Sequence, residues 1–405
     1  MAGLAAARAL ADAGFAVVVF EREARVGGRV LTLDLGDGRV EAGASHIWSF
    51  YRGTHRWMKR CGLLSDLQPA PGGGALPVAV RDLPGIARSA FEVARWWRQL
   101  DFQRPELAVP LDTGSIAAYA DRHLQPDFVA AALRPAFEWN AFCSLDQLSQ
   151  VLLLQAGRLY LRARPRVLQG GLDRLPRAMA QGLDIRLGVS GHVRRIRSMD
   201  QGVVVELDSG AAVACRAAVL ATTPAEAAQL AGLPPEVSTF LSGIRHSAVT
   251  RAWWELPALA GDPGQLVRRA PGELPAVLAA ARRGNVIRVA AAAYGEAAAR
   301  FRARGGQPVS AQMRALAGTL LPTLRDRPHL AESGFHWERA VTLFVPGHFR
   351  QLAAVAPGRM VDSMALAGDY LVSPTVEGAI LSGERAADMI RSHILGTVIR
   401  RLPCV

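Results

Sequence analysis

The sequence predicts an α/β fold in which a sheet-and-helix domain, built from three separate stretches of chain, is interleaved with a second, α+β domain. Three observations lead to this prediction. A helical pattern followed by a short apolar strand opens the chain, a run of short strands lies in the middle, and a strand followed by a long helix lies near the end. With 405 residues the chain is long enough for two domains with a large core.

The opening segment has the pattern of a Rossmann-like βαβ unit whose first strand is missing. An Ala-rich helical pattern over residues 2–13 begins beside Gly3, and an apolar strand pattern over residues 16–20 is closed by Glu21. In such a unit the third glycine packs the helix on the sheet, and the acidic residue accepts hydrogen bonds from a ribose. We therefore predict that Gly3 and Glu21 contact a dinucleotide whose phosphates lie at the helix N-terminus.

The first strand of that unit and its first two glycines do not occur before Met1. A central strand of about five buried apolar residues contributes on the order of 8–15 kcal/mol. This is comparable with the net stability of a whole domain, roughly 5–15 kcal/mol. We therefore expect a misplaced start. The alternative is a truncated, cofactor-free protein that serves as a binding or scaffold protein.

A glycine turn follows Glu21 directly and is predicted to belong to the same site. Arg22 comes first, Gly27 and Gly28 form the turn, and Arg29 ends it. Paired glycines let the backbone approach a cofactor closely, and an arginine can meet a phosphate or the edge of a flavin. The strand patterns at 30–35 and 40–42 then predict a hairpin around the turn at 36–38.

A third motif lies near the end of the chain. A strand at 364–367 runs into Gly368 and Asp369, and a helix is predicted from about Glu377, so that the N–H groups of Gly378 and Ala379 lie at its start. Asp369 is placed to hydrogen-bond a ribityl or phosphate-bearing chain. A helix N-terminus favours the negative charge that a flavin gains at N1 and C2=O on reduction.

The remaining segments complete the predicted domains. Residues 55–165 have a mostly helical pattern, with a loop at 72–74 and a helix over 84–100. Strands are predicted at 185–187, 193–196, 203–207, 211–220 and 286–293, and a helix near 310–321. We assign 1–55, 166–240 and 336–395 to the nucleotide-binding domain, and 56–165 and 241–335 to the substrate domain.

Taken together, these motifs resemble the flavin-containing amine oxidase superfamily, which includes protoporphyrinogen oxidases and carotenoid-type desaturases. Segments 170–176, 218–224, 337–340 and 346–348 also resemble family segments. The resemblance implies FAD, a Rossmann-like FAD-binding domain, hydride transfer from a substrate C–H to flavin N5, and a main-chain contact to adenine from the strand at Val193. The predicted cofactor-binding residues are Gly3, Glu21, Arg22, Gly27, Gly28, Arg29, Val193, Gly368, Asp369, Glu377, Gly378 and Ala379.

Two departures from the family pattern bear on the substrate. Amine oxidases of this superfamily commonly use a lysine near N5, but Lys59, the only lysine here, lies in the wrong region. Many also place a tyrosine where this chain has Thr375. We therefore expect dehydrogenation or desaturation of a largely hydrophobic small molecule, with isoprenoid-like or porphyrinogen-like substrates ahead of an amine.

The sequence offers few catalytic candidates. His46 can act in proton transfer or satisfy a loop carbonyl, Trp337 can flank the flavin or fill a core, and Tyr370 can contact cofactor or substrate. Neither H-E-x-x-H nor G-x-S-x-G occurs, and no metal site is expected. Hydride transfer to a flavin often depends more on positioning than on an acid or base.

The charge and composition limit the kinds of binding partner that we expect. The net charge of +12 comes almost entirely from arginines scattered along the chain, with no basic stripe, so we expect no nucleic-acid partner. The 84–100 segment mixes apolar and basic residues and can contact a membrane surface, or pack on the substrate domain with its arginines outward. Four dispersed cysteines and the lack of a long uncharged apolar run predict a cytoplasmic protein.

Overall fold

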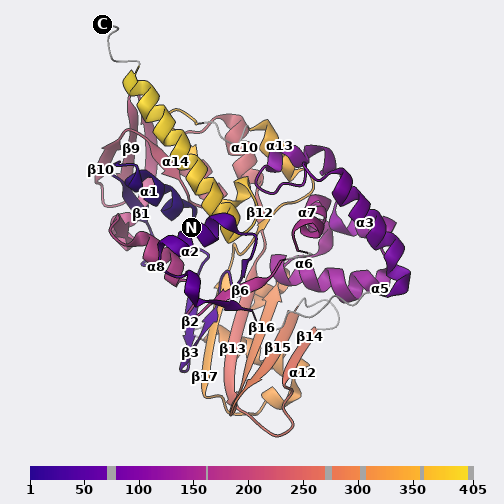
Figure 1. The fold of residues 1–405 in the computed structure, drawn as a ribbon. Helices are drawn as coiled ribbons and strands as arrows, with labels where there is room; N and C mark the ends of the chain where they lie inside the picture. The colour runs from indigo at the N-terminus through magenta and orange to yellow at the C-terminus, as the bar shows by residue number, and fades with distance from the viewer. Residues whose placement is uncertain (71–78, 161–162, 270–275, 302–306, 356–359, 400–405) are drawn as a thin grey trace.

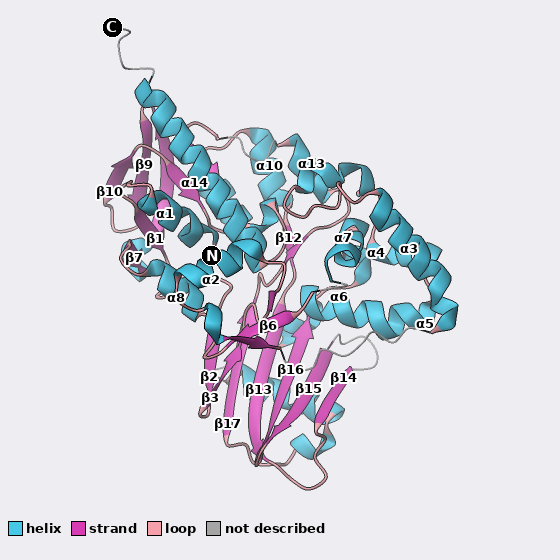
Figure 2. Cartoon of the chain, in the orientation of Figure 1, coloured by secondary structure: helices cyan, strands magenta, loops and turns pink. Residues whose placement is uncertain are grey.

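The computed structural model describes residues 1–405 except 71–78, 161–162, 270–275, 302–306, 356–359 and 400–405. The predicted loop at 72–74 lies outside the described residues. Helices and small parallel strand pairs form one part of the molecule, a five-stranded sheet forms a second, and a group of helices forms a third (Figure 1, Figure 2). The predicted α/β class is confirmed.

The start, middle and end of the chain meet in the first of these parts. Helix α1 (Ala2–Asp12) packs along the C-terminal helix α14 (Val376–Ile399) (Figure 1). A Cβ added at Gly383 of α14 would lie 2.2 Å from the Ala2 carbonyl oxygen, so only glycine permits this close crossing. Buried small residues of both helices, with Leu10, Ile390 and Ile394, fill the interface.

Two separate pairs of parallel strands belong to this part. Strand β1 (Val18–Glu21) pairs with β7 (Asp184–Leu187), and β11 (Ala218–Leu220) pairs with β19 (Met364–Leu366). The helix, strand and glutamate predicted at the start of the chain are present, with β1 beginning two residues later than expected. Parallel pairing joins segments far apart in sequence, which the pattern of one segment cannot specify.

One predicted strand is wrong. Residues 211–220 were expected to form a single strand, but they form β10 (Ala212–Cys215) and β11, which belong to different sheets. β10 completes an antiparallel sheet with β8 (Val193–Met199) and β9 (Gly202–Leu207). The chain turns at Arg216, and the Ala218 N–H then donates to the Ser363 carbonyl at 3.0 Å. A continuous apolar pattern does not indicate such a change of sheet.

The predicted hairpin after the glycine turn is confirmed as β2 (Thr32–Leu35) and β3 (Gly38–Glu41). Strands β4 (Ile47–Trp48), β6 (Pro165–Leu168) and β5 (Leu67–Pro69) form a small antiparallel sheet in that order. Helix α8 (Arg174–Ala180) follows β6. The loop at 42–46, between β3 and β4, lines the large cavity described below.

The second part is an antiparallel sheet with the order β14-β15-β16-β13-β17. Its strands are β13 (Val249–Pro257), β14 (Gln265–Arg269), β15 (Ala276–Arg283), β16 (Val286–Tyr294) and β17 (Ala331–Trp337). Helix α11 (Glu296–Arg300) follows β16, and α12 (Val309–Leu320) packs on the sheet around the fully buried Trp254. The strand predicted at 286–293 and the helix predicted at 310–321 are confirmed.

The third part is helical, as predicted for residues 55–165. It contains α3 (Leu83–Arg95), α4 (Ile116–His123), α5 (Pro126–Phe128), α6 (Arg134–Ala141) and α7 (Gln150–Tyr160), whereas α2 (Arg52–Arg60) packs on α14 of the first part. Shorter elements connect the parts: α9 (Pro224–Leu230), α10 (Pro235–Gly243), β12 (Arg245–His246) with β18 (Thr342–Leu343), and α13 (His348–Ala354). Among the described residues, no helix is long and apolar enough to cross a membrane.

Candidate functional site

One large cavity, about 3140 Å³ in volume, runs through the parts of the molecule described above. At one end it is lined by α1, β1 and the glycine turn, and at the other by α3, α6 and α7. Residues 42–46 and strands β13 and β17 line it between these ends. A ligand that spans the cavity would therefore contact α1, β1 and the glycine turn as well as the helical part.

The first end carries the residues that the βαβ pattern singled out. Gly3 at the start of α1, Glu21 at the end of β1 and Val193 at the start of β8 all line the cavity. One oxygen of the Glu21 carboxylate accepts the Glu23 N–H at 2.9 Å. Arg22 also lines the cavity but forms an ion pair with Glu226 at 2.6 Å. The side chain of Arg22 is thus held by α9.

The glycine turn borders the cavity in a backbone conformation that favours glycine. Gly27 has φ of +106° and Gly28 has φ of +57°. At Gly27 a Cβ would also lie 3.0 Å from Pro176 and from the Val30 carbonyl oxygen, whereas at Gly28 the space is open. Both glycines line the cavity, so a cofactor can approach the backbone closely there.

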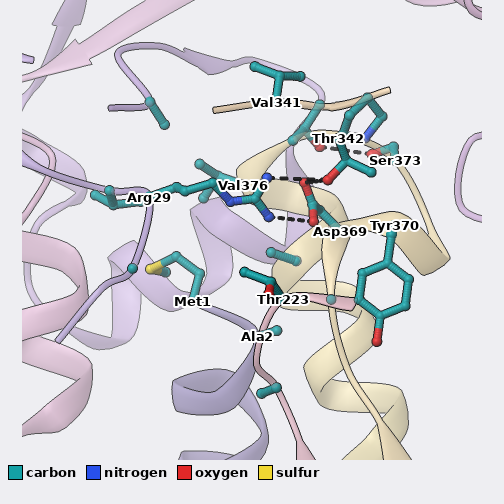
Figure 3. Close-up of a pocket in the computed structure, with 18 of the residues that line it drawn as sticks. Met1, Ala2, Arg29, Thr223, Val341, Thr342, Asp369, Tyr370, Ser373 and Val376 are labelled. Atoms are coloured by element: carbon teal, nitrogen blue, oxygen red, sulfur yellow. Dashed lines mark hydrogen bonds and ion pairs between the residues drawn. The ribbon is translucent and has the colours of Figure 1, made fainter. Parts of the chain in front are cut away.

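Arg29 and Asp369 come together from opposite ends of the chain (Figure 3). Arg29 Nη2 donates to Asp369 Oδ1 at 2.6 Å, and its Nη1 donates to Thr342 Oγ1 at 3.2 Å. The Thr342 hydroxyl donates to the second Asp369 oxygen at 2.9 Å. Asp369 is buried and Arg29 is partly exposed to the cavity. This network gives the cavity a fixed guanidinium beside a fixed carboxylate.

The start of α14 differs from the prediction. Ala379 and Val376 line the cavity, but Gly378 and Glu377 do not. The Gly378 N–H donates to Thr375 Oγ1 at 3.0 Å, and the Ala379 N–H donates to the Thr375 carbonyl at 3.0 Å. These two N–H groups were predicted to point at the cofactor. They are instead capped by Thr375, the residue that stands at the position of the family's tyrosine.

Glu377 was predicted to bind the cofactor, but its side chain is hydrogen-bonded to another helix. Its side chain is fully buried. One oxygen accepts the Gly53 N–H at 2.8 Å, and the other accepts the Thr54 N–H and the Thr54 hydroxyl, each at 2.7 Å. These donors belong to the first turn of α2, whose N–H groups have no partner within the helix. Glu377 therefore joins α14 to α2 and does not face the cavity.

The three catalytic candidates occupy different environments. His46 lines the cavity, and its Nδ1 lies 2.8 Å from the Ser45 hydroxyl. Burial, and then the nearby Arg251, lower the pKa of His46, so its imidazole is neutral at neutral pH. Trp337 also lines the cavity, and its indole N–H donates to the Ala42 carbonyl at 2.8 Å, which fixes the ring beside residues 42–46.

Tyr370 borders the cavity, but its ring points away from the Arg29–Asp369 pair (Figure 3). The ring packs over Gly368, where a Cβ would lie 2.1 Å from Tyr370 Cε1. Gly368 is therefore a packing requirement as well as a cavity-lining residue. The Tyr370 side chain is buried among Leu220, Leu352 and Met364, so it fills the core rather than contacting a ligand.

Sequence reasoning missed two charged residues, one that lines the cavity and one whose charge acts on it. Arg251 on β13 lines it between residues 42–46 and the helical part, and Glu41 lies at the end of β3 behind it. Burial raises the pKa of Glu41 to about 7, although hydrogen bonds from the Leu172 N–H and Thr32 oppose the shift. An arginine in the apolar run Val249–Leu256 was the available signal.

These residues fit the flavin dinucleotide that the motifs imply. A carboxylate at the end of β1 suits ribose hydroxyls, and the first turn of the 11-residue helix α1 together with Arg29 suits a pyrophosphate. Gly27 and Gly28 leave room for the cofactor to pass, and Asp369 offers a buried acceptor farther along the cavity. The residues that fit the cofactor therefore line the cavity from its nucleotide end to its middle.

Comparison with known proteins agrees with this fit. The family described as "Flavin containing amine oxidoreductase" matches residues 1–257. Among solved structures, cyclohexylamine oxidase from Brevibacterium oxydans is similar, with a TM-score of 0.75, 19% identity and 97% of each chain covered. Putrescine oxidase bound to putrescine has a TM-score of 0.73 and 18% identity over 96% of this chain and 97% of its own. At these identities the two structures show a shared fold.

Proposed function

Because this chain belongs to the flavin-containing amine oxidoreductase family and is an FAD-dependent oxidoreductase, we propose that it dehydrogenates or desaturates a largely hydrophobic small molecule. The observation that carries the proposal is the large cavity, whose two ends differ in their lining. Polar and charged groups line its nucleotide end, whereas Val93, Phe128, Leu133, Phe137 and Leu152 are among the residues that line the helical end. A substrate at that end would be held chiefly by apolar contact.

When bound, FAD would supply a two-electron acceptor for a hydride from a substrate C–H, with dioxygen or another acceptor as the final oxidant. The protein's own residues position the reactants. Arg29 and Asp369, which are hydrogen-bonded to each other, would hold the cofactor chain, and Trp337, whose indole N–H donates to the Ala42 carbonyl, would flank the reactants. Apolar side chains at the helical end exclude water from the C–H bond.

The proton that leaves with the hydride needs an acceptor. His46 is neutral because burial and Arg251 lower its pKa, so it can take a proton but cannot act as a cationic acid at neutral pH. A substrate whose dehydrogenation releases its proton directly to solvent would not need His46. Exchange of His46 for glutamine therefore tests whether the reaction uses this base.

Amine oxidation is the second candidate, because the two similar structures are amine oxidases by name. An ammonium or amine at the middle of the cavity would meet Arg251, whose positive charge raises the cost of a second cation there. This charge supports an apolar or anionic substrate over a cationic one.

The test uses protein purified and reconstituted with FAD. We expect flavin absorbance bands that stay with the protein on gel filtration, and anaerobic bleaching of the band near 450 nm by candidate apolar substrates. Cyclohexylamine and putrescine serve as the amine comparison. Retention of FAD with bleaching by the amines alone would replace the proposal with amine oxidation. A protein that holds no FAD would contradict both.

We further propose that the outer face of α3 contacts an anionic membrane surface. Leu83 and Phe91 are 51% and 66% exposed, and Arg88 and Arg95 lie three and four residues from Phe91, on the same side of the helix. The opposite face of the helix, including Ile86, Ser89 and Val93, lines the cavity. A membrane-bound α3 would thus bring an apolar substrate close to its site.

Vesicle flotation tests this contact. We expect binding to vesicles that contain phosphatidylserine, weaker binding to pure phosphatidylcholine, and loss of binding in a Phe91→Ser variant. If the unaltered protein and the Phe91→Ser variant were recovered equally in the vesicle-free fraction, this would favour the alternative, in which α3 packs on the substrate domain with its arginines in solvent.

A further inference from the structure

Arg251 is held at the middle of the cavity by the sheet of the second part. It lies in β13, opposite Ala292 of β16 and Phe335 of β17, so strands on both sides fix its backbone. Residues two apart in a strand share a face. Val249 and Arg251 both line the cavity, and Trp253, next on the same face, lies under the guanidinium with its ring centroid 4.9 Å from Arg251 Cζ.

The guanidinium has little else to bind. Its Nη1 donates to the Gly43 carbonyl at 3.4 Å, near the limit for a hydrogen bond. Within the part of the chain that the structure describes, no carboxylate forms an ion pair with Arg251. Two other cavity arginines differ in this respect, because Arg22 pairs with Glu226 and Arg29 pairs with Asp369.

Glu41 is the acid whose charge acts on Arg251, but it is a poor counter-ion. One of its oxygens accepts the Leu172 N–H at 2.7 Å, and the other accepts the Thr32 hydroxyl at 2.8 Å. Its pKa of about 7 leaves it partly protonated at neutral pH. Burial lowers the pKa of Arg251 to about 10, so the guanidinium stays charged but is poorly solvated.

We propose that Arg251 is a specificity-determining residue that binds a carboxylate of the substrate, which is an apolar carboxylic acid. The proposal rests on the proposed oxidoreductase function and names the substrate class of that same site. A planar guanidinium can hold a carboxylate through two parallel hydrogen bonds. The apolar body of the acid then lies toward α3, α6 and α7, where Val93, Phe128 and Leu133 line the cavity.

The expected difference in affinity follows from the hydrogen bonds and charge that the substrate's carboxylate contributes. A hydrogen bond to a charged group is worth about 1.5–3 kcal/mol, which corresponds to roughly 10-fold to 150-fold in a dissociation constant. A neutral amide of the same length can replace part of the hydrogen bonding but not the charge. An amine of that length would place a second cation beside Arg251. We expect the order acid, amide, amine in affinity.

The experiment titrates FAD-loaded protein with decanoate, decanamide and decylamine as probes. Binding is read from the flavin absorbance spectrum and, independently, from tryptophan fluorescence, since Trp253 lies directly under Arg251. We expect decanoate to bind at least about 10-fold more tightly than decanamide. Arg251→Met should reduce this ratio to about one, and Arg251→Lys should keep an intermediate preference because the charge remains.

Arg216→Met is the matched control. It removes a cavity-lining arginine that stacks on Phe15 at the nucleotide end, with a centroid distance of 5.7 Å, and it should keep the preference for decanoate. Equal affinities for decanoate and decanamide in the unaltered protein would overturn the proposal, as would a preference that survives Arg251→Met. Loss of flavin bands would contradict the oxidoreductase function, whereas the tryptophan readout still reports on Arg251.

Discussion

Replacement of Glu377 by glutamine separates a structural role from a cofactor-binding role for this residue. The carboxylate accepts three hydrogen bonds from Gly53 and Thr54 at 2.7–2.8 Å, and the side chain is fully buried. In Glu377→Gln the amide oxygen can replace one acceptor, but the NH₂ group then faces a backbone N–H. At least one buried N–H loses its partner, at about 1–3 kcal/mol, and the remaining bonds lose their charge assistance.

We therefore expect Glu377→Gln to lower the free energy of unfolding by about 2–4 kcal/mol, and Glu377→Ala by somewhat more. Urea denaturation of the FAD-free protein, followed by circular dichroism, measures this change. Glu384→Gln is the matched control. Glu384 lies on the same helix and accepts from Arg56 and Trp57 of the same α2, but this contact is partly exposed, so we expect a loss of no more than about 1 kcal/mol.

Two outcomes would refute this reasoning. One is an FAD-free Glu377→Gln protein whose unfolding free energy lies within about 0.5 kcal/mol of the unaltered protein. The other is a variant of normal stability whose FAD affinity falls more than about 10-fold, which corresponds to about 1.4 kcal/mol of binding energy. The first result would contradict the structural role of Glu377, and the second would return this residue to the cofactor site.

Three further predictions concern other parts of the cavity. Asp369→Asn leaves Arg29 without its counter-ion, and we expect about 10-fold weaker FAD binding by fluorescence titration; unchanged affinity would contradict the assigned role. Because the folded-state pKa of Glu41 is raised from 4.5 to about 7, the folded protein binds more protons between these values. Stability should therefore fall as pH rises from about 4.5 through 7, by up to about 3 kcal/mol, and Glu41→Gln should flatten that dependence in urea denaturation. Gly28→Ala meets open space, so its cost should be only that of a positive φ, about 1 kcal/mol, whereas Gly27→Ala should cost more through contact with Pro176; equal thermal shifts for both would exclude the steric argument.

The first β/α unit was predictable from sequence because its signals are local. An Ala-rich helix beside Gly3, a Val-rich strand and a terminal Glu21 each follow from the preferences of neighbouring residues. The glycine turn was predictable for the same reason, since positive φ at Gly27 and Gly28 is a property of single residues. The structure places all of these residues along the cavity.

The predictions that needed distant partners were less successful. Glu377 was expected to face a cofactor because it starts a helix after Asp369, yet its acceptors are used by backbone groups more than 300 positions away. Residues 211–220 were expected to form one strand, but the partners of its two halves lie in different sheets. The partners of Glu377 and of residues 211–220 cannot be predicted from the residues of either segment alone.

Arg251 shows most clearly the difference between what the sequence determines and what the tertiary structure decides. By itself the sequence determined the cofactor class, the α/β fold and several residues that line the cavity, because glycine conformation, helix ends and strand patterns are properties of short segments. Only the tertiary structure decided which charges are paired. An arginine's partner is set by packing among β3, β13 and the loop at 42–46, and packing across distant segments leaves this guanidinium in the cavity without an ion pair among the described residues.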